Sequence, residues 1–178
     1  MKIVKTIGIA IVSLIALVLI AALFVSNDFD YEKSVVIDGP IDSVWQHTNS
    51  LAALEKWSPW NDYDPSMLKE FKGTDGKVGA MTSWDSKVEN VGRGSQTITK
   101  IDSPSYFGTD LKFYSPFESE ADGYIKLEAM GEQTKVTWGF NSEMPYPFNL
   151  MMVAMNADST IGKDFALGLS KLKVLAEQ

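Results

Sequence analysis

The sequence contains no cysteine, one histidine (His47) and one arginine (Arg93). The absence of cysteine excludes disulfide bonds, thiol catalysis and cysteine-bound metal sites, although it says little about the cellular compartment. One imidazole cannot make a multi-histidine metal site. Glycine-rich phosphate loops, His-Glu-x-x-His and nucleophile-elbow motifs are also missing. The sequence therefore predicts no cofactor and no metal ion, and it gives an enzyme little direct support.

Charge is missing from residues 7–25, a run made almost entirely of Ile, Leu, Val and Ala. As a helix that rises about 1.5 Å per residue, this run covers roughly 28 Å, which is close to the hydrocarbon thickness of a bilayer. Lys2 and Lys5 precede the run, whereas Asp28 and Asp30 follow it. This bias in positive charge places the amino terminus in the cytoplasm.

The apolar run predicts a single-pass membrane anchor over residues 1–27 and a separate domain over residues 28–178, in the periplasm or outside the cell. The alternative is a cleaved secretory signal, which has a shorter apolar core and small residues before the cut. Ala21 and Ala22 offer only a poor cleavage site. Both interpretations export the domain, and cleavage stays open.

The exported part is acidic. All 23 acidic residues follow the apolar run, and 14 of the 16 basic residues remain once Lys2 and Lys5 are set aside, which gives a net charge of −9. Such a domain is repelled by nucleic acid and by anionic lipid headgroups. We therefore expect no nucleic-acid partner, and we expect membrane attachment through the apolar run.

The carboxyl-terminal segment Asn156–Gln178 has helical periodicity. Asp158 or Ser159 is expected to cap this helix, and Lys171 lies near the negative end of its dipole. The apolar face needs a partner surface, so a sheet should wrap the helix. The residues on that face are Ile161, Phe165, Gly168, Leu169, Leu172, Leu175 and Ala176.

Alternating apolar residues predict a first strand over Phe29–Asp38. Gly39-Pro40 ends that strand, and a short helix follows to about Thr48. A second short helix over Leu51–Trp57 is halted by Pro59, and an aromatic loop runs on to residue 65. Phe148–Met155 is expected to add a helical turn or two. Six further strands are expected over residues 67–73, 78–86, 94–102, 106–114, 123–130 and 134–144.

Sequential strands with short turns indicate an antiparallel meander, and helices on one face make the fold α+β. This order carries several short motifs, each weak alone. They are Gly39-Pro40 with Val44-Trp45, Trp57-Ser58-Pro59-Trp60, Gly76-Lys77-Val78-Gly79-Ala80 with Trp84, Gly92-Arg93-Gly94-Ser95, Thr134-Lys135-Val136-Thr137-Trp138, and Ile161-Gly162-Lys163-Asp164-Phe165 with Gly168-Leu169.

In this order the motifs resemble the helix-grip superfamily, called SRPBCC, which includes START domains, plant pathogenesis-related allergens and the polyketide cyclase/dehydrase and lipid-transport family. The sequence is most similar to small bacterial members with an amino-terminal membrane segment. The resemblance covers most of residues 28–178. It implies a curved seven-stranded antiparallel sheet around a long carboxyl-terminal helix, with a deep apolar cavity between them. It implies no particular reaction.

Nine residues are candidates for the lining of this cavity. The indoles of Trp57 and Trp60 close the pocket or pack at the sheet edge. Inward-pointing strand aromatics serve equally as core or as lining, and methionines suit either a permissive pocket or an irregular core. Gly168 leaves room for a ligand or allows close packing of the helix. The remaining candidates are Trp84, Phe113, Trp138, Phe140, Met152 and Phe165.

The sequence thus predicts a membrane-anchored protein that binds a hydrophobic small molecule or lipid in the cavity. One alternative is an enzyme of cyclase or dehydratase type that uses Asp62, Tyr63, Asp64 or His47. Alternating acids in a proline-rich loop are also ordinary turn formers, and Arg93 between two glycines is typical of a hairpin. The other alternative is a non-catalytic interaction module. Ligand identity, oligomeric state and protein partners stay unspecified.

Overall fold

Seven antiparallel strands form one sheet in the order β1-β7-β6-β5-β4-β3-β2. The computed structural model describes residues 2–154 and 157–178. The predicted seven strands and the α+β class are confirmed. The strands are β1 (Asp28–Ile37), β2 (Leu68–Lys72), β3 (Met81–Asp85), β4 (Arg93–Asp102), β5 (Tyr106–Ser115), β6 (Ser119–Met130) and β7 (Gln133–Glu143).

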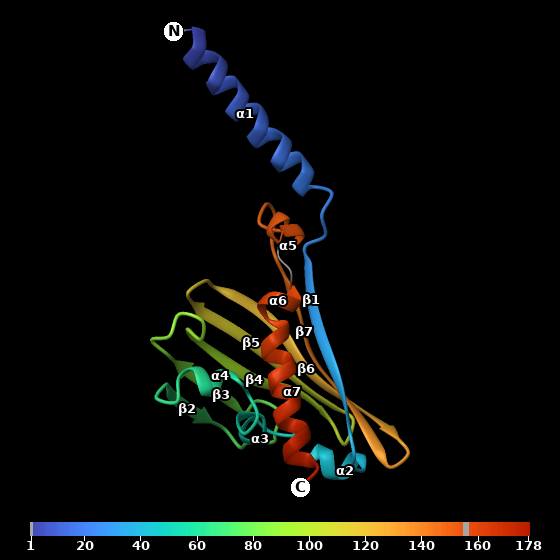
Figure 1. The fold of residues 1–178 in the computed structure, drawn as a ribbon. Coiled ribbons are helices and arrows are strands. Elements are labelled where there is room, and N and C mark those ends of the chain that lie inside the picture. The colour runs from blue at the N-terminus through green and yellow to red at the C-terminus, as the bar shows by residue number, and fades with distance from the viewer. Residues whose placement is uncertain (1, 155–156) are drawn as a thin grey trace.

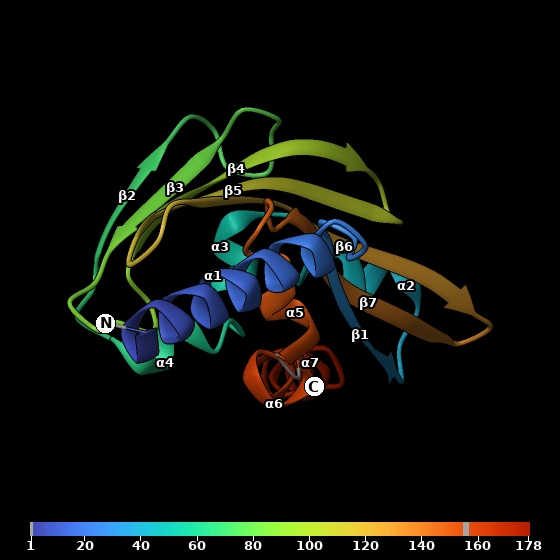
Figure 2. The same ribbon diagram turned by 90° about the horizontal axis from the view of Figure 1, so that it is seen from above.

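The sheet is curved, and its concave face holds the helices (Figures 1 and 2). Between β4 and β5 the register shifts at Arg93/Gly94 and again at Ile98/Lys100. Such bulges add a residue to one strand and bend it, which increases the local twist. Strand β1 closes the other side by pairing with β7, from Asp28 opposite Glu143 to Ile37 opposite Thr134.

Two short helices follow β1 as expected, α2 (Ile41–Trp45) and α3 (Leu51–Glu55). The predicted loop over residues 57–65 is wrong in part, because α4 (Trp60–Tyr63) forms a helical turn there. The carbonyl of Pro59 accepts a hydrogen bond from the Asp62 backbone N–H at 3.0 Å. Proline is tolerated at a helix start, where its missing N–H needs no partner. Pro59 therefore both ends the α3 segment and opens α4.

The predicted continuous helix over Asn156–Gln178 is wrong at its start. The chain forms α5 (Leu150–Ala154), α6 (Ala157–Thr160) and α7 (Gly162–Ala176). The N-cap of α7 is Ile161, which makes no side-chain cap. Instead of capping α7, the Asp158 carboxylate accepts a hydrogen bond from the Tyr31 hydroxyl at 2.5 Å. Met155 and Asn156, which the prediction included, lie outside the described residues.

Close packing against β1 explains the break. Lys33 of β1 also pairs with Asp158, at 3.1 Å. A Cβ atom at Gly162 would collide with the Tyr31 hydroxyl and would lie 2.9 Å from an Asp158 carboxylate oxygen. The Asp158 side chain therefore ties α6 to β1 at the point where α7 begins.

The hydrophobic core fills the end of the fold that lies away from α1. It is built from α2, α3, the sheet and the second half of α7. The predicted apolar face of α7 is confirmed, since Phe165, Leu169 and Leu172 are buried. The largest fully buried side chains include Trp57, Phe107, Ile37, Leu51, Ile98, Ile125 and Leu172.

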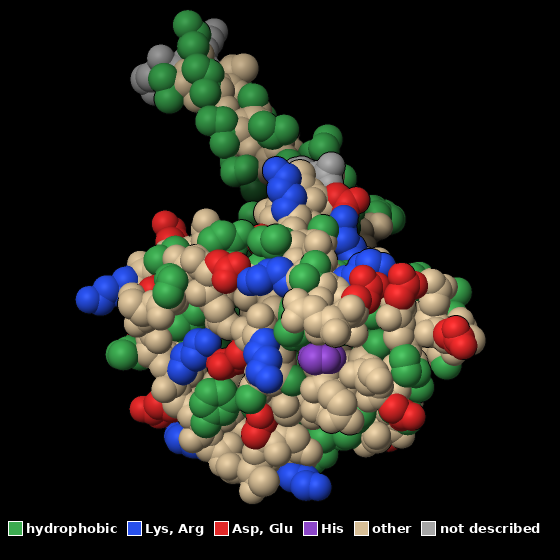
Figure 3. Space-filling model, turned by 60° about the horizontal axis from the view of Figure 1, so that its bottom comes forward, with side chains coloured by type: hydrophobic (Ala, Val, Ile, Leu, Met, Phe, Trp, Pro, Cys, Tyr) green, Lys and Arg blue, Asp and Glu red, His purple; other side chains and the backbone are tan. Residues whose placement is uncertain are grey.

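Helix α1 (Lys2–Ala22) extends away from the sheet (Figure 1). Its stretch Ile3–Ala22 is long and apolar enough to cross a membrane, a test that a signal sequence also passes. Hydrophobic side chains cover the visible part of α1, whereas acidic and basic side chains are interspersed over the rest of the surface in that view (Figure 3). The apolar amino-terminal helix predicted from the sequence is thus present.

Candidate functional site

A cavity of about 440 Å³ lies between the concave face of the sheet and the helical layer. Its volume falls within the range of about 300 to 1,000 Å³ that is usual for small-molecule sites. The sheet contributes residues from all seven strands, and the other side comes from α3, α4, the segment before β2 and the start of α7. The cavity therefore lies beside the solid core, in the half of the fold nearer to α1.

One wall of the cavity is a cluster of aromatic rings. Trp138 of β7 stacks on Phe165 of α7 with ring centroids 4.2 Å apart. Trp57 and Trp60 meet Trp138 edge to face, at 4.8 and 5.5 Å. Phe140 lies 6.0 Å from Phe165. All five rings were predicted candidates, and all five line the cavity.

The opposite wall carries the other two predicted strand aromatics. Trp84 of β3 and Phe113 of β5 meet edge to face at 5.9 Å, and both line the cavity. Gly94 lies between them on β4, and a Cβ atom there would overlap the Trp84 ring and would lie 2.6 Å from the Lys112 carbonyl oxygen. Trp84 can lie flat across β4 only because residue 94 has no side chain.

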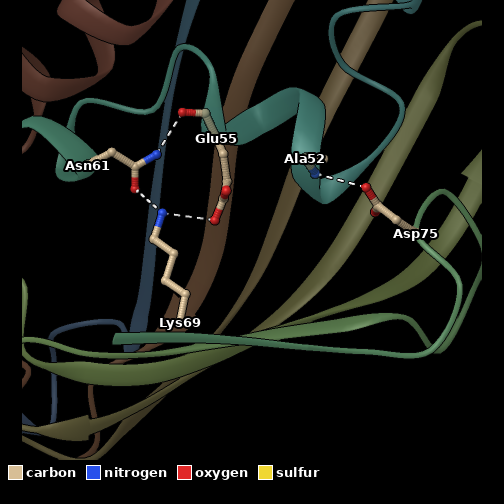
Figure 4. Close-up of polar contacts among 5 residues, drawn as sticks. All are labelled: Ala52, Glu55, Asn61, Lys69 and Asp75. Carbon is tan, nitrogen blue, oxygen red and sulfur yellow. Dashed lines mark hydrogen bonds and ion pairs between the residues drawn. The ribbon is translucent and has the colours of Figure 1, made fainter. Parts of the chain in front are cut away.

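A polar network crosses the cavity wall where α3, α4 and β2 meet (Figure 4). The Lys69 ammonium donates to the Glu55 carboxylate at 2.9 Å and to the Asn61 amide oxygen at 2.8 Å. The Asn61 amide nitrogen donates to the Glu55 backbone carbonyl at 2.6 Å. All three residues line the cavity. An ammonium has three donors, and these bonds use two of them.

Helix α3 is itself fixed from the turn between β2 and β3. The Asp75 carboxylate accepts from the backbone N–H of Leu51 at 2.9 Å and from that of Ala52 at 3.0 Å (Figure 4). Ser50 caps the same helix by accepting from the Ala53 N–H at 3.1 Å. Together these bonds satisfy orphan donors of the first turn, so the helix presents Leu51, Leu54 and Glu55 to the cavity in a fixed position.

Uncharged polar groups lie deeper on the sheet side. The Gln96 amide donates to the Thr109 hydroxyl at 3.0 Å, and this hydroxyl donates to the Gly123 carbonyl at 3.4 Å. The apolar lining thus holds a short hydrogen-bonded row across β4, β5 and β6. Such a row offers orientation to a ligand without placing a charge inside the cavity.

Two predicted candidates lie outside the lining that the described residues define. Met152 belongs to α5 and is partly exposed there. Gly168 is buried on α7, where a Cβ atom would lie 2.7 Å from the Trp138 ring and 3.2 Å from Pro59. Of the two explanations for Gly168, close packing of the helix therefore accounts for it.

The residues considered for catalysis make structural contacts. Asp62 pairs with Lys171 at 2.7 Å, and the Tyr63 hydroxyl donates to Asp164 at 2.5 Å, a bond that raises the pKa of Tyr63. Burial lowers the pKa of His47, with a smaller contribution from nearby Lys56. None of Asp62, Tyr63, Asp64 and His47 lines the cavity as the described residues define it. Across residues 2–154 and 157–178, no three His, Cys, Asp or Glu side chains are grouped to hold a metal ion.

Asp64 joins two loops beside the cavity, and its carboxyl makes the stability of the fold depend on pH. Its carboxylate accepts hydrogen bonds from Ser86 at 2.5 Å and Ser66 at 2.7 Å, and these bonds lower its pKa. A carboxyl with a lowered folded-state pKa contributes stability above its ordinary value of 3.8, and this contribution is lost as the pH falls through the folded value.

We expect Asp64→Asn to melt at a lower temperature than the wild type near pH 7. Because the wild-type carboxyl protonates in acid, the difference should shrink as the pH is lowered below the ordinary pKa. Thermal denaturation of both proteins followed by circular dichroism across this pH range measures the difference. A gap that stays constant down to strongly acidic pH would contradict the assignment of these bonds to the ionised form.

Several lining residues were not predicted from the sequence, for two different reasons. Leu111 lies on the inward parity of β5 together with Thr109 and Phe113, so strand alternation could have identified it. Lys69 lies on the short edge strand β2, and its partners Glu55 and Asn61 belong to other elements. No local spacing connects these three residues, because the network exists only after α3 and α4 pack over β2.

The comparisons with known proteins agree with this architecture. The family model for polyketide cyclase/dehydrase and lipid transport matches residues 28–177. Among curated proteins, none matches the chain. A solved structure from Thermobifida fusca shares 17% identity, with a TM-score of 0.61 over 83% of this chain and 92% of that one. A protein from Nitrosospira multiformis shares 19% identity, with a TM-score of 0.58 over 82% and 94%.

A third similar structure is DynU16, from the dynemicin biosynthetic locus. It shares 13% identity, with a TM-score of 0.55 over 84% of this chain and 47% of that one. At such low identity, these three structures establish the fold alone.

Proposed function

Because the chain belongs to the polyketide cyclase/dehydrase and lipid transport family, we propose that it binds a hydrophobic small molecule or lipid in the cavity. The observation that carries this proposal is the cavity itself, about 440 Å³ of space with aromatic and aliphatic walls. A ligand that buries about 300 Å² of apolar surface gains roughly 7.5 kcal/mol at about 25 cal/mol per Å², before the entropy losses of binding.

The charged groups around the cavity favour a ligand with a neutral head. Among the described lining residues the carboxylates are Glu55, Glu120 and Glu143, and the cation is Lys69. Lys112, beside the lining, pairs with Glu120 at 3.0 Å. Lys69 is already paired with Glu55. A carboxylate head would find Lys69 and Lys112 already paired and would meet the charge of Glu143, whereas a hydroxyl can use the remaining Lys69 donor and the Gln96 row.

We therefore expect dodecanol to bind about tenfold more tightly than dodecanoate near neutral pH, a difference of about 1.4 kcal/mol. Both share one alkyl chain, so the difference reports on the head alone. Displacement of the neutral dye N-phenyl-1-naphthylamine from the full-length protein in mild detergent measures both affinities. Tighter binding of dodecanoate would contradict the expected repulsion.

We place the cavity at a membrane. The length and apolar character of α1 support a span, and the cations Lys2 and Lys5 before it support a cytoplasmic amino terminus with the domain in the periplasm or outside the cell. A cleaved signal sequence is the alternative for the same helix. Recovery of the protein in carbonate-washed membranes, at the mass of the intact chain, would support the span, and a soluble shortened product would contradict it.

A reaction on the bound molecule would need ionisable side chains inside the cavity. The Glu55 and Lys69 pair is the observation that keeps a cyclase or dehydratase activity open as a second proposal. Binding is the part that the apolar lining supports directly.

The test of binding is a titration of the full-length protein with N-phenyl-1-naphthylamine. We expect the dye emission to rise to saturation at one dye per chain and to fall when dodecanol is added. An emission that grows only with the amount of detergent, with no saturation, would overturn the proposal.

A further inference from the structure

The end of the fold next to α1 carries an apolar surface that we call the rim. It consists of Leu23 and Phe24 after α1, Phe117 in the turn between β5 and β6, and Phe148, Met151 and Val153 in and before α5. Their exposed fractions run from 55% for Met151 to 85% for Phe24. Exposed apolar residues that stand alone are ordinary, but a cluster of large ones is typical of a contact surface.

Hydrogen bonds hold the α5 part of the rim against the end of α1. The Asn149 amide nitrogen donates to the carbonyls of Ala22 and Val25, both at 2.9 Å. The Tyr146 hydroxyl donates to the Leu19 carbonyl at 3.3 Å, and the Met144 N–H donates to the Asn27 carbonyl at 2.7 Å. Phe148 and Met151 therefore lie beside the last turn of the helix that is apolar enough to cross a membrane.

Strand register brings Phe117 to the same end. Ala121, just after the β5–β6 turn, pairs with Ser142 of β7, and Glu143 at the end of β7 pairs with Asp28 at the start of β1. The turn that carries Phe117 therefore lies at the end of the sheet where the chain enters from α1. Figure 1 shows this turn and α5 on the side of the fold from which α1 departs.

The cavity opens toward this end. The lining residues that are exposed are Asn90, Ser119, Glu120 and Glu143, which lie in or beside the β3–β4 turn, the β5–β6 turn and the end of β7. The lining at the other end is buried, with Leu51 and Ile125 at 1% exposed and Phe107 likewise at 1%. The cavity thus has a closed floor at the core and a mouth at the rim.

We propose that the rim docks into the surface of the bilayer and sets the cavity mouth against lipid, so that a ligand passes between bilayer and cavity without crossing water. This inference rests on the proposed membrane attachment and hydrophobic ligand. Aromatic and aliphatic side chains next to a spanning helix suit the boundary between headgroups and acyl chains. Carboxylates beside the rim, such as Asp28, Glu118 and Glu143, make the fitting partner a zwitterionic surface, because anionic headgroups would repel them.

The absence of native cysteine makes a direct test possible. Single cysteines replace Phe117 or Met151 of the rim, Leu14 in the middle of α1, or Val78 in the β2–β3 turn and Val174 of α7, which are 63% and 62% exposed at sites away from the rim. Each full-length variant carries an environment-sensitive fluorophore and is reconstituted in phosphatidylcholine nanodiscs. Quenching by nitroxide-labelled lipids then reports the contact of each site with the bilayer.

We expect strong quenching at residues 14, 117 and 151, several-fold above that at residues 78 and 174, with no increase when phosphatidylglycerol is added. Quenching at residue 14 together with rim labels as unquenched as residues 78 and 174 would overturn the docking and leave the anchored ligand-binding function in place. An unquenched label at residue 14 would overturn the attachment itself, and the docking with it. Stronger rim quenching with phosphatidylglycerol would refute the zwitterionic partner.

Discussion

Ala121→Trp is expected to weaken binding of the neutral dye by about 100-fold, or roughly 2.7 kcal/mol. Ala121 points into the cavity from β6, opposite Leu111 of β5. An indole at this position occupies the space through which the ligand tail must pass between the mouth and the floor. Because the cavity is empty of side chains there, the added volume meets open space rather than packed atoms, and the fold should persist.

The matched control is Ala129→Trp on the same strand. Ala129 is exposed and lies beyond the lining, near the turn between β6 and β7. Both variants add one indole to β6. A difference in dye affinity, measured in equal amounts of detergent, therefore reports on the position of the indole alone. Equal dye affinity of the two variants would show that the dye binds elsewhere than in the cavity.

Leu172→Ala is expected to lower the free energy of unfolding by about 3 kcal/mol, within the usual range of about 2 to 5 for a buried leucine. Leu172 is fully buried on α7, where it packs into the core between the helix and the sheet. For a domain of this size, such a loss lowers the melting temperature by roughly 6 to 12 °C. Thermal denaturation of the full chain in detergent, followed by circular dichroism, measures it.

Val174→Ala serves as the control, because Val174 is on the same helix but 62% exposed. Surface substitutions of this kind usually change stability by less than about 0.5 kcal/mol. A loss for Leu172→Ala as small as that for Val174→Ala would mean that the face of α7 that the sheet covers contributes little to the free energy of unfolding.

The fold could be predicted largely because its strands alternate and its last helix is amphipathic. Periodicity located β4, β5, β6 and β7 to within a few residues, and the face of Phe165, Leu169 and Leu172 required a sheet opposite it. The sequence could not foresee the break before Gly162, where Asp158 bonds to Tyr31, 127 positions away in the chain. Such contacts leave no local pattern.

The sequence could predict which strand side chains point inward, but not which of them line the cavity and which belong to the core. Trp84, Phe113, Trp138 and Phe140 had the right parity, yet core and cavity residues share that parity, so only the packed structure separates them. Met152 illustrates the limit. Methionine suits either a permissive pocket or an irregular core, and its place was decided by how Asn149 holds α5 against the end of α1.

The central claim is that the cavity holds a hydrophobic molecule. Native mass spectrometry of wild type and Ala121→Trp tests this claim most directly. Both full-length proteins are purified from membranes in mild detergent, which is removed in the gas phase. We predict a reproducible adduct on the wild type that fragments to an uncharged lipid or other apolar compound, and its loss from Ala121→Trp. A bare wild-type chain, or an adduct of equal abundance on both proteins, would contradict the claim.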